Sequence, residues 1–102
     1  MSEFQPCTYI MASGRRGYIY IGVTSGLLQR VHQHRSKAVP GYSSDRHTVL
    51  LVRLELFGTM EQAIGREKQL KNWRRDWKIK LVETDNPDWV DLAAGLGLGP
   101  LD

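Results

Sequence analysis

Two short strand-forming segments near the N-terminus, joined by a turn rich in glycine and arginine, constrain the fold of this chain most strongly. They cover residues 7–11 and 17–24. Glycines and polar residues between such segments suit a hairpin connection, so the two are expected to pair antiparallel. Because side chains alternate along a strand, Ile21 and its aliphatic neighbours face one side, while Tyr20 and Gly22 face the other. The sequence therefore predicts a hairpin with one aliphatic face and one tyrosine-bearing face.

After the hairpin, the hydrophobic pattern becomes helical and then returns to alternation. The helical stripe starts at Gly26, and the helix should end before Pro40, because proline restricts the residue that precedes it. Residues 48–57 alternate as a strand. We expect this strand to be central in the sheet, with a single apolar face made by Leu50, Val52, Leu54 and Leu56.

Helices complete the pattern. Thr59 and Gln62 match a capping box, which predicts a helix from there to about Trp73. Residues 75–83 predict another helix, and residues 86–89 predict the cap and first turn of a short terminal helix. The expected fold class is α+β, with the order ββαβα followed by C-terminal helices.

Length and composition limit the class of protein. The 102 residues fit one domain over 1–102, with an expected core over about 7–83 and a short helix and flexible tail over 84–102. A hydrophobic share of 41% and a charged share of 25% are ordinary for a globular protein, and no apolar run is long enough to span a membrane. The N-terminus lacks the features of a signal peptide, so a cytoplasmic location is expected.

Cysteine usage and charge narrow the chemistry. The single cysteine, Cys7, excludes an internal disulfide and a thiolate zinc site, so any metal should have oxygen ligands. A formal net charge of +3 is compatible with nucleic acid, with an anionic ligand or with neither.

Glu67 is the most informative charged residue. It projects from the apolar stripe of its predicted helix, which consists of Met60, Ala63, Ile64 and Leu70. A carboxylate in that setting has to be paired, hydrogen-bonded or bound to a metal, because an unpartnered charge costs several kcal/mol or shifts its pKa. An ion pair with Lys71 or with an arginine is the structural alternative.

Four further residues could line one cleft. Arg30 and His34 lie one turn apart on the first helix, and Tyr9 and Tyr20 lie on the paired strands. Taken singly, each has an ordinary explanation, since an edge arginine extends into water and strand tyrosines pack.

The combination resembles the GIY-YIG nuclease superfamily, on Tyr9, Tyr20-Ile21-Gly22, Arg30 and Glu67. The segments 22–24, 30–34, 63–71 and 86–89 are similar to its small stand-alone bacterial YhbQ-like branch. The family implies a three-stranded antiparallel sheet flanked by helices. Two departures stand out, because Cys7-Thr8-Tyr9 replaces Gly-Ile-Tyr, and Val23 stands where some repair members have a lysine.

The resemblance also implies roles. Tyr20, and secondarily Tyr9, would deprotonate or position the attacking water, and Arg30 would face the scissile phosphate. Glu67 would be the sole protein ligand of Mg²⁺ or Mn²⁺, and His34 matches an active-site histidine of some restriction enzymes. Arginine and a metal suit this reaction, because both neutralise charge that develops on phosphate oxygens. The sequence leaves open whether Tyr20 acts as the base or only orients water.

The expected partner is DNA, single- or double-stranded, cut by a monomer or weak dimer, in the setting of DNA repair or recombination. Gly22 is expected to contact this substrate, as are Lys71, Arg74 and Arg75 in a segment that interleaves basic residues with Trp73 and Trp77. The tryptophans either stack on bases or, as we expect, pack the terminal helices. Two alternatives for the whole chain remain: a catalytically silent nucleic-acid-binding module and a small protein-interaction module.

Overall fold

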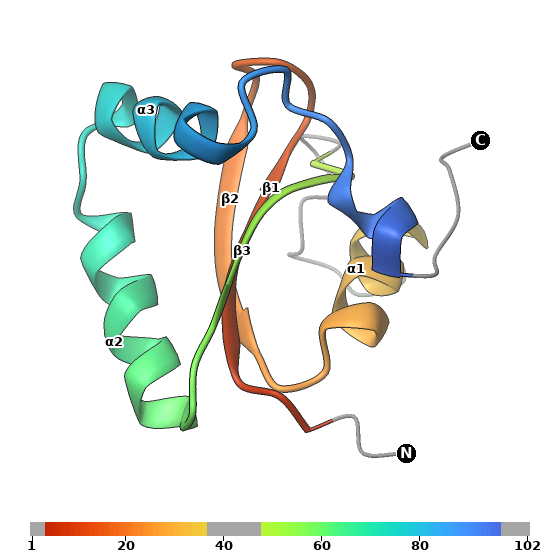
Figure 1. Ribbon diagram of the computed structural model, residues 1–102, viewed down its shortest axis with the longest axis vertical. Helices are drawn as coiled ribbons and strands as arrows, with labels where there is room; N and C mark the ends of the chain where they lie inside the picture. Colours follow the sequence, from red (N-terminus) through yellow and green to blue (C-terminus); the bar gives the residue numbers. More distant parts are fainter. Residues whose placement is uncertain (1–3, 37–47, 97–102) are drawn as a thin grey trace.

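The computed structural model describes residues 4–36 and 48–96, which form a three-stranded antiparallel sheet with helices on both faces (Figure 1). This confirms the α+β fold and the element order expected from the sequence. The elements are β1 (Cys7–Ala12), β2 (Ile19–Thr24), α1 (Leu27–Ser36), β3 (Leu50–Leu56), α2 (Met60–Lys71), α3 (Arg75–Asp85) and the 3-10 helix η1 (Leu92–Leu96).

The predicted hairpin is confirmed. β1 and β2 pair antiparallel, and their register sets Tyr9 opposite Gly22 and Met11 opposite Tyr20. The connecting turn is closed by the Gly17 amide, which donates to the Gly14 carbonyl at 3.0 Å. A Cβ at Gly17 would lie 2.3 Å from the Ser13 hydroxyl oxygen, so any side chain there would displace the hydroxyl that accepts a hydrogen bond from the Tyr18 amide.

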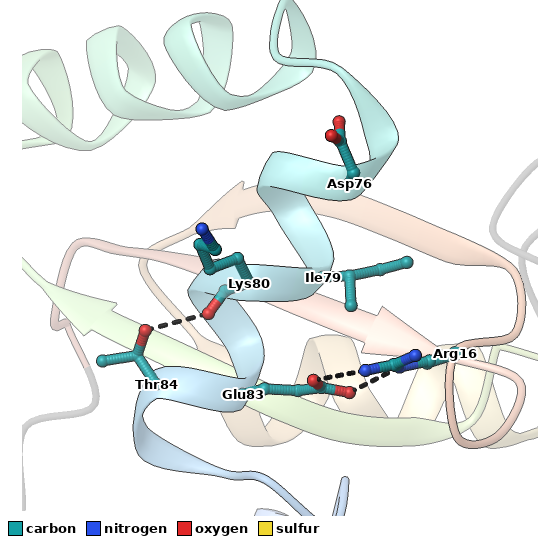
Figure 2. Close-up of a pocket in the computed structure, with 6 residues that line it drawn as sticks. All are labelled: Arg16, Asp76, Ile79, Lys80, Glu83 and Thr84. Carbon is teal, nitrogen blue, oxygen red and sulfur yellow. Dashed lines mark hydrogen bonds and ion pairs between the residues drawn. The ribbon is translucent and has the colours of Figure 1, made fainter.

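Side chains of α3 hold the same turn against the body of the domain. The Arg16 guanidinium donates two hydrogen bonds to the Glu83 carboxylate, at 2.8 and 2.9 Å (Figure 2). These bonds, together with one donated by the Trp89 indole at 2.7 Å, lower the pKa of Glu83 to about 2. Arg75 donates to the backbone carbonyls of Arg16 and Gly17.

The strand order differs from the expectation. It is β2-β1-β3, so the central strand is β1, and β3 lies at an edge. The pairing of β3 also shifts at a bulge, where Ile10 lies opposite Arg53 but Met11 lies opposite Leu51. An extra residue reverses the faces on either side of it. Leu50 and Val52 therefore pack on one face of the sheet and Leu54 on the other, and Leu56 is exposed, so the predicted single face is wrong.

Two apolar clusters cover the two faces of the sheet. One joins Ile10, Ile21 and Val52 to Leu70 of α2 and Val82 of α3, and the other joins Met11 and Leu51 to Val31 of α1. Figure 1 shows the same division, with α2 and α3 on one side of the sheet and α1 and η1 on the other. Trp89 belongs to the first cluster and Ala93 to the second, so the core extends beyond residue 83.

The start of α2 agrees with the sequence signal, whereas its end and the segment after α3 do not. Thr59 caps α2 by accepting a hydrogen bond from the Gln62 amide at 3.1 Å, as the capping box predicts, although the helix ends at Lys71 and leaves Trp73 outside it. The predicted helix start at residues 86–89 is wrong. Asn86 instead ends α3, and its side-chain amide donates to the carbonyls of Val52 and Val90.

Within the described residues, no helix is long and apolar enough to cross a membrane.

Candidate active site

A buried hydrogen bond between β1 and α1 organises the tyrosine-bearing face of the hairpin. The Tyr9 hydroxyl lies 3.2 Å from Nε2 of His34. The two side chains are 1% and 0% exposed, so neither reaches solvent. Burial, reinforced by the positive charge of Arg30, lowers the pKa of His34 to about 4. His34 is therefore a neutral imidazole at neutral pH, with one donor and one acceptor nitrogen.

Tyr20 completes a ring cluster with this pair. Its ring centroid lies 4.8 Å from that of His34, in an edge-on arrangement, and 6.4 Å from that of Tyr9. Tyr20 and Arg30 are half-buried, in contrast to Tyr9 and His34. Tyr20 and Arg30 thus form the accessible layer of the cluster, and Tyr9 and His34 lie behind it and fix its geometry.

Gly22 has a packing role that its sequence motif alone does not reveal. It lies opposite Tyr9 in the sheet, and a Cβ at this position would meet the Tyr9 hydroxyl at 2.4 Å and the ring carbon that bears it at 2.5 Å. Gly22 is itself buried. The absence of a side chain at Gly22 is therefore what allows the Tyr9 ring to lie across β2 toward His34. Substrate contact by Gly22 stays a prediction.

Glu67 lies apart from the ring cluster, on α2, which packs against β1 and β2 on the opposite face of the sheet from α1 (Figure 1). Its side chain is 17% exposed and forms an ion pair with Lys71 at 3.1 Å, one turn along the helix. The structural alternative raised by the sequence, an ion pair with Lys71, is thus present. The apolar stripe beside it is only partly buried, since Ala63 and Leu70 are enclosed but Ile64 is 37% exposed.

The donor chemistry of the described residues suits a hard cation with few protein ligands. Among residues 4–36 and 48–96, no group of three or more histidine, cysteine, aspartate and glutamate side chains is placed to hold a metal. Glu67 offers carboxylate oxygens, and Lys71, its partner, is 53% exposed and can turn into solvent. Mg²⁺ keeps several waters and binds through one or two carboxylates plus substrate oxygens, so a single glutamate fits it.

The three basic residues that are expected to contact substrate each have different interaction partners. Lys71 pairs with Glu67. Arg74 lies over the Trp77 ring, 5.1 Å from its centroid, and approaches Asp76 at 3.4 Å. Arg75 is engaged with the carbonyls of the β1–β2 turn. Trp73 packs on the core as expected, whereas Trp77 is 49% exposed, contrary to the expectation that both tryptophans pack.

An ion pair that sequence reasoning missed fixes the end of α1 near His34. Arg35 forms it with Asp91, and both side chains are mostly buried. Asp91 also accepts hydrogen bonds from the amides of Leu51 and Ala93, at 3.1 Å each. The segment after α3 therefore supports the helix that carries Arg30 and His34. The sequence signal was weak, because one arginine and one distant aspartate have no spacing that predicts a pair.

Comparison with known proteins adds an independent line of evidence. Residues 5–80 match the GIY-YIG catalytic domain. A UPF0213 protein of Staphylococcus haemolyticus (strain JCSC1435) is 31% identical over 65 residues, covering 64% of this chain and 79% of that protein. A UPF0213 protein of Haloquadratum walsbyi (strain DSM 16790 / HBSQ001) is 34% identical over 65 residues, covering 64% of this chain and 73% of the Haloquadratum protein. No solved structure matches the chain.

Proposed function

Because the chain belongs to the GIY-YIG family, whose domain supports a nuclease-type function, we propose that it is a divalent-metal-dependent DNA endonuclease that hydrolyses phosphodiester bonds. The observation that carries the proposal is the ring cluster of Tyr9, Tyr20 and His34 beside Arg30. The cluster presents one phenol and one guanidinium at an accessible surface and supports them with a buried hydrogen bond. DNA repair or recombination is the proposed setting.

Arg30 has the chemistry required at the scissile phosphate. Attack on phosphorus increases the negative charge on the nonbridging oxygens, and a fixed guanidinium stabilises that charge as it develops. Arg30 is half-buried and close enough to His34 for its charge to lower the imidazole pKa. Because His34 stays neutral at neutral pH, it adds no positive charge that would repel the guanidinium of Arg30.

Tyr20 is proposed to orient the attacking water or to take its proton. A phenol with an ordinary pKa of about 10 is a poor base at neutral pH, so a nearby cation must assist if Tyr20 is the base. Tyr9 does not reach the surface, so we assign it a positioning role through His34. His34, which Tyr9 holds in place, contacts the Tyr20 ring edge-on and so helps to fix the orientation of the accessible phenol.

Glu67 is proposed to hold Mg²⁺ or Mn²⁺. When bound, the metal would supply charge neutralisation at the phosphate and a lowered pKa for a coordinated water. β2 is an edge strand, and α2 contacts it from the face opposite α1. We therefore place the substrate across the β2 edge, where a strand of DNA can meet Arg30 from one side and Glu67 from the other.

The remaining predicted contacts belong to substrate binding. Lys71 follows Glu67 by one turn and forms an ion pair with it. When substrate binds, the Lys71 ammonium leaves the Glu67 carboxylate and pairs with a phosphate of the DNA instead. Arg74 and Arg75 extend this basic segment. The hydrogen-bond partners of Arg75 are neutral carbonyls, so they do not neutralise its positive charge. Phosphate contacts of this kind orient the strand without reading its sequence.

The decisive experiment incubates the protein with labelled single-stranded and duplex DNA, with Mg²⁺, with Mn²⁺ and with excess chelator. Metal-dependent cleavage that the chelator abolishes is the expected result. The Lys71 ion pair of Glu67 favours the alternative of a catalytically silent nucleic-acid-binding module. Binding without cleavage under every metal condition would establish that alternative and overturn the nuclease proposal.

A further inference from the structure

A pocket of about 330 Å³ lies at the junction of α2 and α3, on the side of the sheet away from α1. Its lining residues are Trp73, Trp77, Lys80, Leu81 and Thr84, and we call it the tryptophan pocket. Four of the five come from one face of α3, because positions three and four apart in a helix are neighbours. The two indole rings meet at 86°, with centroids 5.8 Å apart.

Packing accounts for only part of this pocket. Trp73 and Leu81 are half-buried against the apolar cluster of the core, so their side chains stabilise the fold. Trp77 has no such explanation, because 49% of it is exposed beside the pocket. Trp73 meets this ring edge-on and Arg74 lies over it, so the exposed half of Trp77 is the part that a ligand can reach.

The rim of the tryptophan pocket is basic. Arg74 lies over the Trp77 ring, and its nearest carboxylate, Asp76, is at 3.4 Å in a pair whose members are 71% and 70% exposed. Such an exposed pair contributes little and is readily exchanged for another anion. Figure 2 shows the amino group of Lys80 pointing away from the Arg16–Glu83 ion pair, so the Glu83 carboxylate does not neutralise it.

An aromatic surface with cations at its rim selects the ligand chemistry. A cationic ligand, such as a quaternary ammonium, would be repelled by Arg74 and Lys80. A nucleotide offers both parts that the pocket requires, a flat ring for the indole and a phosphate for the cations. Stacking of bases on aromatic side chains next to a basic groove is how proteins hold single strands without reading sequence.

We propose that the tryptophan pocket binds an unpaired base of single-stranded nucleic acid by stacking on Trp77, with Lys80 and Arg74 at the adjoining phosphates. A base inside a duplex is stacked on its neighbours and cannot reach the indole unless it is flipped out at an energetic cost. The pocket therefore favours substrates with a single-stranded segment. This inference deepens the proposed function by naming its substrate class.

The tryptophan pocket begins where α2 ends. Glu67 and Lys71 lie one turn apart on α2, and Trp73 comes two residues after the end of that helix. The Arg66 guanidinium lies over the Trp73 ring, 5.3 Å from its centroid, and donates a hydrogen bond to Glu55 of β3, so Trp73 is linked to the β3 side of the sheet. That the strand held in the pocket is also the strand cut near Glu67 is the part of the inference that rests on the proposed function.

The test compares wild type with Trp77→Ala in binding a labelled oligothymidylate, the same oligonucleotide with abasic sites, and a duplex, all in chelator so that nothing is cut. Replacement of a stacking aromatic is expected to weaken oligothymidylate binding by about 5-fold to 150-fold. The abasic strand keeps the phosphates but lacks the rings, so it should bind both proteins equally. Leu56→Ala, at a 60% exposed position on β3, is the matched control and should bind as wild type does.

A second pair of variants tests the phosphate contact. Lys80→Gln should reduce the slope of log affinity against log salt by about 0.7 on single strands, and Lys78→Gln, on α3 but outside the pocket lining, should not. Equal affinity of Trp77→Ala and wild type for oligothymidylate would overturn the inference, as would equal losses on the normal and abasic strands. Metal-dependent cleavage by wild type in that case would leave the nuclease proposal intact. Trp77-dependent binding without any cleavage would support the stacking inference and overturn the nuclease proposal.

Discussion

The Tyr9 hydroxyl and Nε2 of His34, 3.2 Å apart, form a buried hydrogen bond between the central strand and α1. This bond fixes the rotation of α1 relative to the hairpin, because it joins two side chains that are almost completely enclosed. Arg30 lies one turn before His34 on the same helix. The position of Arg30 is therefore linked to this bond through α1, which connects a packing contact of the core to the proposed chemistry.

His34 should make folding stability depend on pH. Its pKa is about 4 in the folded protein and about 6.5 in the unfolded chain, so between these values only the unfolded state binds the proton. Stability is then fully present above about pH 6.5 and is lost as pH falls toward 4, by up to about 1.4 kcal/mol per pH unit. Urea unfolding from pH 7.5 to 4 measures this slope.

Two variants identify the source of that slope. His34→Asn should flatten it, whereas His32→Asn, at an exposed position on the same helix, should leave it as in wild type. Carboxylates also titrate toward pH 4, so the comparison between variants is decisive. An identical slope in His34→Asn and wild type would contradict the low pKa.

Gly22→Ala should destabilise the fold by about 1 to 3 kcal/mol, because the new methyl group would overlap the Tyr9 ring and force it to shift. Gly65→Ala provides the matched control. Nothing lies within 4 Å of a Cβ at Gly65, inside α2, so alanine there should stabilise the protein by about 0.5 to 1 kcal/mol. Chemical denaturation of both variants checks the signs. The double variant Gly22→Ala, Tyr9→Leu should recover part of the loss, and strict additivity would refute the proposed clash.

The hairpin, the cap of α2 and the half-buried position of Glu67 could be predicted because each depends on residues close in sequence. Alternation decides the faces of β2, and Thr59 meets Gln62 within one turn. The bulge in β3 could not be predicted, because both registers bury leucines and only pairing with β1 selects one. The bond between Tyr9 and His34 likewise requires α1 to dock on the sheet at a particular angle. The family resemblance named the site residues, but it did not reveal that Tyr9 and His34 lie behind the accessible layer.

Arg30→Ala should reduce turnover by about 10²-fold to 10³-fold while changing DNA affinity much less. A positioned cation acts on charge that is present only in the transition state, so its loss affects the chemical step more than binding. Single-turnover cleavage and equilibrium binding, measured on the same substrate, separate the two effects. His32→Ala is the control on the same helix and should cleave normally. If Arg30→Ala lost affinity and rate in equal proportion, Arg30 would be a docking residue instead.

Glu67→Gln should remove metal-dependent cleavage with little change in the fold. The amide keeps the size of the carboxylate in its half-buried position but binds Mg²⁺ and Mn²⁺ far less well, because it carries no charge. Loss of the ion pair with Lys71 should cost only about 0.3 to 0.5 kcal/mol, as expected for an i,i+4 pair on a helix. Glu61→Gln, at an exposed position in the first turn of α2, is the matched control.

The same two variants distinguish a metal ligand from a structural ion pair without relying on cleavage. Titration with Mn²⁺ in the absence of DNA, followed by electron paramagnetic resonance, should show a protein-bound ion in Glu61→Gln and none in Glu67→Gln. Lys71→Gln removes the competing ammonium, so Mn²⁺ should bind this variant at least as tightly as wild type in the absence of DNA. Because the ion pair and the metal compete for the same oxygens, a role for Glu67 that was only structural would leave Mn²⁺ binding unchanged in all three variants. That outcome would remove Glu67 from the proposed site.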